Sequence, residues 1–191
     1  MPMALRLSQL LWIAIVWMVP RSLRAQNVAP FAVPFRVPSV AGSARLKDSA
    51  FVGDAMAYHY QGRRITGLDV FVWPTPVSSA DSAQRDSLLL LEVEKFKQTI
   101  PLGVQRGWYE TYEIAFDAPH PVALASDSLR GYVVAFVFMR RREPFTSFFY
   151  IYAVHDMYLK IRLTVPGDNW NTNPALDVPA ELVRAVAEPR R

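Results

Sequence analysis

Cysteine is absent from the 191-residue chain. The fold therefore contains no disulfide bond, and thiol nucleophiles and zinc sites with cysteine ligands are excluded. Only three histidines occur, none at ligand spacing from another, and we expect His120, between two prolines, in an exposed turn. The chain also lacks the short motifs of nucleotide-binding, α/β-hydrolase and zinc-protease sites. We therefore expect no metal site and no cofactor.

The first 25 residues have the pattern of a secretion signal. A short basic start is followed by a nearly apolar stretch over residues 7–19, which is shorter than the ~20 residues of a membrane-spanning helix. Pro20 ends this stretch, and Ala25 gives a small residue before a cleavage point. We expect an exported protein, periplasmic or extracellular, with no transmembrane span after cleavage. Arg21 and Arg24 leave an uncleaved N-terminal membrane anchor as the alternative.

The net charge of the chain falls when this segment is set aside. The chain has 21 basic and 17 acidic residues, giving +4. Three arginines and no acid lie in residues 1–25, so the remainder has 18 basic against 17 acidic residues, or +1. The composition therefore gives no indication of nucleic-acid binding.

Prolines are concentrated directly after the predicted signal. Pro30, Pro34 and Pro38 recur every four residues within residues 26–42, and each favours an extended backbone. We expect a proline-rich extended arm or linker here. Residues 43–191 are expected to form one domain.

The patterns within this domain alternate between strands and helices. A capping-box pattern at Asp81 and apolar residues at helical spacing predict a deeply packed helix that Pro101 and Gly103 end. Runs rich in aromatic and β-branched residues predict strands. The predicted strands cover residues 54–60, 65–73, 108–116, 130–139, 145–154 and 157–165, and a second helix covers 178–187.

The last three strands are expected to pair as an antiparallel meander. A two-residue turn at His155 and Asp156 sets Tyr152 opposite Leu159, and a loop over residues 140–144 sets Phe136 near Phe148. One face then collects Tyr132, Val134, Phe136, Phe138, Phe148, Tyr150, Tyr152, Leu159, Ile161 and Leu163. Because the other face is also largely apolar, we expect an α+β fold with helices covering both faces of the sheet, or a sheet curled around a helix.

The order of these elements resembles that of PsbP-like α+β domains. The resemblance rests on an aromatic strand pair, a tight turn before the final strand MYLKIRLTV, and a tryptophan-bearing loop that leads to a terminal helix. It implies an antiparallel sheet covered by helices on both sides. It also implies a protein that binds or helps assemble other proteins rather than a catalyst.

Two groups of side chains are candidates for binding. Arg140, Arg141 and Arg142 lie in a predicted hairpin loop, where they could contact an acidic envelope protein or an anionic surface. Lys160 and Arg162 alternate in the last strand, on the face of Phe149 and Ile151. Their charged ends either pair with acids such as Glu181 on the terminal helix or form an anion site beneath that helix.

Trp170 is the remaining candidate, as either a core lid or an exposed contact residue. The pattern as a whole favours an exported, non-enzymatic binding or assembly domain. A secreted hydrolase is an alternative, using His59 or His155 in a pocket lined by Tyr58, Tyr60 and Trp73. A carrier of a small apolar ligand, held between the sheet and the leucine-rich helix, is the other.

Overall fold

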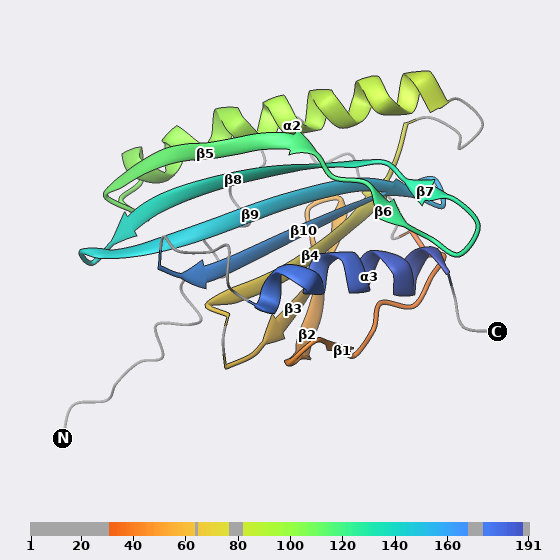
Figure 1. The fold of residues 1–191 in the computed structure, drawn as a ribbon, viewed down its shortest axis with the longest axis horizontal. Coiled ribbons are helices and arrows are strands. Elements are labelled where there is room, and N and C mark those ends of the chain that lie inside the picture. Colours follow the sequence, from red (N-terminus) through yellow and green to blue (C-terminus); the bar gives the residue numbers. More distant parts are fainter. Residues whose placement is uncertain (1–30, 64, 77–81, 168–173, 189–191) are drawn as a thin grey trace.

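The computed structural model describes residues 31–63, 65–76, 82–167 and 174–188. Within them, eight strands form one curled sheet in the order β1-β2-β3-β4-β10-β9-β8-β5, and every neighbouring pair is antiparallel (Figure 1). The strands are β1 (Val40–Ala41), β2 (Ala44–Val52), β3 (Ala55–Gln61), β4 (Gly67–Pro74), β5 (Thr111–Pro119), β8 (Gly131–Arg140), β9 (Glu143–Val154) and β10 (Met157–Pro166). Short strands β6 (Val122–Ala123) and β7 (Ser128–Leu129) pair separately. The helices are α2 (Ser82–Gln105), α3 (Val178–Ala187) and the 3-10 turn η2 (Pro174–Asp177).

The predicted α+β class with an antiparallel sheet is confirmed. Strand β2 was not predicted from the sequence. Most of its side chains are exposed, and it carries lysine, aspartate and serine rather than a clear apolar alternation. Most residues of β2 are held in the sheet by hydrogen bonds to one neighbouring strand only, β3.

Buried side chains form two clusters, and adjacent residues of the central strands alternate between them. The first cluster contains Tyr150 and Ile161 together with Leu182 and Val183 of α3. The second contains Phe149 and Ile151 together with Leu89 and Val93 of α2. Because successive side chains of a strand point to opposite faces, the clusters lie on opposite sides of β9 and β10. Figure 1 shows α2 running along β5, β8 and β9.

The predicted register between β8 and β9 is wrong by one residue. Residues 140–144 were expected to form the loop, but Arg140 pairs with Glu143 and Ala135 lies opposite Phe148. A shift of one residue moves every side chain of a strand to the other face. Phe136 and Phe138 therefore belong to the second cluster, and Val133 and Ala135 belong to the first.

Helix α2 differs from the prediction in its length and in its burial. It passes through Pro101 and continues to Gln105, although proline removes one hydrogen bond of the helix. The Tyr109 hydroxyl donates to the carbonyl oxygen of Ile100, directly before this proline. Gly107, with a φ of 69°, follows the helix instead of Gly103 ending it. Leu90 and Leu91 are about half exposed, so the helix is packed along one stripe only.

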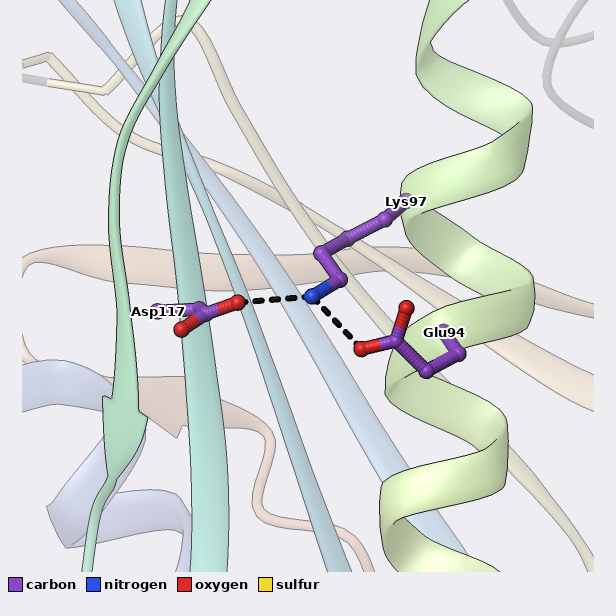
Figure 2. A network of polar contacts seen from close by, with 3 residues as sticks. All are labelled: Glu94, Lys97 and Asp117. Carbon is purple, nitrogen blue, oxygen red and sulfur yellow. Dashed lines mark hydrogen bonds and ion pairs between the residues drawn. The ribbon is translucent and has the colours of Figure 1, made fainter.

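A polar network also connects α2 to the edge of the sheet. The Lys97 ammonium lies 2.5 Å from Glu94 Oε1 on the same helix and 2.7 Å from Asp117 Oδ2 on β5 (Figure 2). The hydrogen bond to Asp117, followed by the one to Glu94, raises the pKa of Lys97 above its usual value. Ion pairs at the surface contribute about 0.2–1 kcal/mol, so this network fixes geometry more than it stabilises.

Candidate functional site

The turn between β8 and β9 presents two of the three predicted arginines to solvent. Arg141 and Arg142 are exposed, and Arg140 is half-buried at the end of β8. The φ angles of Arg141 and Arg142 are 53° and 65°, so both central residues of this two-residue turn are left-handed. Asn-Gly and Asp-Gly are the sequences that such a turn favours. A left-handed residue with a side chain costs about 1–2 kcal/mol, so the chain holds two arginines where its backbone disfavours them.

The turn between β9 and β10 has the same geometry without the charge cluster. His155 and Asp156 have φ angles of 50° and 60°, and Met157 pairs with Val154 as predicted. The His155 ring lies 6.0 Å from that of Phe35. This second turn provides an internal comparison for the arginine-bearing turn.

Lys160 and Arg162 occupy the predicted face of β10. They lie opposite Ile151 and Phe149 of β9, on the side of the second cluster. Their placement beneath the terminal helix is wrong, because α3 packs with the first cluster on the other side. Glu181 of that helix lies near Gly42 and is not a partner of either cation. The sequence indicated the strand face correctly but not which helix lies over it.

The Lys160 ammonium is surrounded by aromatic rings. Its Nζ atom lies 5.2 Å from the ring centres of Phe71 and Phe149, and 5.4 Å from that of Trp73. Lys160 itself is half-buried. Loss of hydration lowers the pKa of Lys160 to about 8, although the negative charge of Glu92 on α2 opposes this change.

Arg162 lies at the centre of a polar group that extends across the sheet. Its Nε donates to Ser147 Oγ at 3.4 Å, and Ser147 shares a 3.0 Å hydrogen bond with Thr164. Asp69 of β4 lies opposite Arg162, and its Oδ1 accepts a 2.7 Å hydrogen bond from His59 Nδ1. Burial lowers the pKa of Arg162, and the negative charge of Asp69 opposes this effect.

Asp69 and Ser147 were missed as site residues in the sequence. Asp69 lies between the apolar residues Leu68 and Val70 of its strand, and Ser147 lies between Thr146 and Phe148. A polar side chain at a position of this kind needs a hydrogen-bond partner inside the fold. That isolated polarity was the signal available in the sequence for Asp69.

The residues proposed for a hydrolase pocket do not line one pocket. Tyr60 is buried in the first cluster and Tyr58 packs against it, whereas Trp73 packs against the second. His59 lies on the Trp73 side, where the Asp69 carboxylate orients its ring.

His120 is half-buried rather than lying in an exposed turn. Its Nδ1 lies 2.6 Å from the hydroxyl oxygen of Tyr152, and its ring packs edge-on against Tyr150. Burial lowers the pKa of His120 below its usual 6.5. The edge strand β5 ends beside it, and the His120 amide donates to the Gly131 carbonyl oxygen.

The lowered pKa of His120 predicts a loss of stability in mild acid. The unfolded chain binds the proton near pH 6.5, and the folded chain binds it only at lower pH. The free energy of unfolding should therefore fall as the pH decreases from about 7 through this window. In His120→Gln, which keeps an acceptor for Tyr152, urea unfolding at several pH values should show a flatter dependence. Equal slopes for the two proteins would contradict the assignment.

The remaining observations limit the site. Trp170 lies outside the described residues. Within residues 31–63, 65–76, 82–167 and 174–188, no three metal-ligating side chains are grouped to hold an ion, and no helix has the length and apolarity needed to cross a membrane.

Neither a protein-family model nor a curated protein matches the chain.

Proposed function

We propose that the protein is an exported, non-enzymatic binding or assembly domain that contacts its partner through Arg140, Arg141 and Arg142. In this proposal residues 1–25 direct export, residues 26–42 form the arm, and the domain is a sheet with a C-terminal three-strand meander and helices on both faces. The resemblance to PsbP-like domains supports a role in binding other proteins. The partner is an acidic protein of the cell envelope.

The arginine turn is the observation that carries the proposal. Among the described residues, Arg141 and Arg142 take part in no ion pair, and both are exposed. Their backbone is left-handed at a free-energy cost that asparagine and glycine would avoid. Strain of this kind is concentrated at binding and switch positions. Arginine is also the basic residue enriched in protein interfaces, because its planar group binds carboxylates with two hydrogen bonds.

Replacing Arg141 with asparagine and Arg142 with glycine separates binding from folding. This pair is the preferred sequence for the turn, so the free energy of unfolding should rise by about 1 kcal/mol. Capture of the envelope partner by crosslinking and mass spectrometry should fall at least about tenfold, because two charges leave the contact. In the original protein, capture should also weaken between low and physiological salt.

The matched control changes the other turn in the same way. His155→Asn with Asp156→Gly adjusts the same backbone geometry and removes no arginine, so its capture of the partner should equal that of the original protein. Capture that both double variants retain would overturn the arginine contact. Binding to vesicles of anionic lipid, with no protein captured, would replace the acidic protein with a membrane surface. The absence of any partner at low salt would contradict the proposal.

A further inference from the structure

Lys160 differs from the other lysines that the structure places on or beside α2. Lys95 lies 2.6 Å from Glu92 Oε1, and Lys97 lies between two carboxylates. Among the described residues, the Lys160 ammonium has no carboxylate within ion-pair distance, and it lies over the three rings around it. Cation–π contact with these rings favours the ammonium, but the loss of hydration at this half-buried position has the larger effect on its pKa.

The charges around Lys160 act in both directions. Burial lowers the pKa of Lys160 most, and the positive charge of Arg162 on the same strand lowers it further. Glu92 on α2 and Asp54 in the β2–β3 turn favour the charged form. The net result is a pKa of about 8, so roughly half of the side chain is free amine at that pH, against less than about 1% of an ordinary lysine.

We propose that Lys160 is a carbonyl-reactive amine that forms an imine with small oxo acids such as glyoxylate, whose carboxylate Arg162 binds. The Nζ lone pair attacks the carbonyl carbon and gives a carbinolamine, which loses one water molecule to form the C=N bond. Both protons of the amine nitrogen leave with the carbonyl oxygen as this water molecule. Nothing is oxidised or reduced. This site is independent of the arginine turn and of the function proposed for it.

The geometry of the strand supports this assignment. Lys160 and Arg162 are two residues apart on one face, with Cα atoms about 7 Å apart, which suits a small molecule whose carbonyl and carboxylate are close together. The Arg162 guanidinium has five N–H donors, of which Nε is used by Ser147. Phe71, Trp73 and Phe149 make the surroundings of the amine apolar, which favours the loss of water.

Reductive labelling of the full-length protein tests the amine. The protein is treated with glyoxylate and cyanoborohydride at pH 8, and peptide mapping measures the carboxymethylation rate of each lysine. Lys160 should react at least about tenfold faster than Lys47, Lys95 and Lys97, because much more of it is unprotonated. A Lys160 rate equal to or below theirs would overturn the proposal.

The role of Arg162 is measured first without a variant. Propionaldehyde has no carboxylate, so the ratio of glyoxylate to propionaldehyde labelling should be several-fold higher at Lys160 than at exposed Lys47. In Arg162→Met, with folding checked by circular dichroism, this ratio should fall to that of Lys47. A ratio at Lys160 that equals that of Lys47 in the original protein would overturn the selection of carboxylates.

Discussion

Gly131→Ala is expected to reduce the free energy of unfolding by about 3 kcal/mol, because no space exists for a methyl group at the start of β8. A Cβ atom there would lie 2.3 Å from two ring carbons of Tyr152 and 2.8 Å from the carbonyl oxygen of Ile151. The Tyr152 ring is fully buried, so it cannot move aside into solvent. Its displacement would also disturb the hydrogen bond to His120. Urea unfolding followed by fluorescence measures the change.

Gly67→Ala is the matched control for this substitution. Gly67 also lies in a strand, β4, but a Cβ atom there would have no other atom within 4 Å. Alanine restricts the unfolded chain more than glycine does, so this variant should be neutral or more stable by up to about 1 kcal/mol. Similar losses at both positions would show that backbone effects of glycine, rather than contact with Tyr152, cause the result.

The sequence predicted the sheet well where a strand pair is fixed by a clear turn. The pairing of Met157 with Val154 and of Leu159 with Tyr152 is as expected, because a histidine and an aspartate tolerate the left-handed backbone of a two-residue turn. The turn at Arg141 and Arg142 has the same form, but nothing in an Arg-Arg pair indicates it. A longer loop was the ordinary expectation, and the single-residue error exchanged the two faces of β8.

The candidate site was predictable only in part for a related reason. The alternation of Lys160 and Arg162 correctly placed both cations on the face of Phe149. Their neighbours come from β4 and α2, which lie about 70–90 residues earlier in the chain. No local pattern connects Phe71 or Asp69 to Lys160 or Arg162. Such contacts depend on the strand order, in which β4 inserts beside β10.

The same strand order makes Phe149 the position where helix, sheet and lysine meet. Its ring stacks on that of Phe96 in α2, with centroids 3.8 Å apart and planes 4° apart, and it also contacts Lys160. Phe149 is 2% exposed, so Phe149→Ala should cost about 3–5 kcal/mol of unfolding free energy. Urea unfolding of the single variants and their double variant forms a cycle with Phe96→Ala.

Stacked rings in direct contact should not contribute independently in this cycle, and a coupling energy of about 1 kcal/mol is expected between Phe96 and Phe149. Leu91→Ala is the control on the same helix, and it should change stability by less than about 0.5 kcal/mol because Leu91 is 49% exposed. Coupling near zero would mean that the aliphatic contacts of Leu89, Val93 and Ile100 hold α2 on the sheet. The helix would then be attached independently of the stacked rings of Phe96 and Phe149.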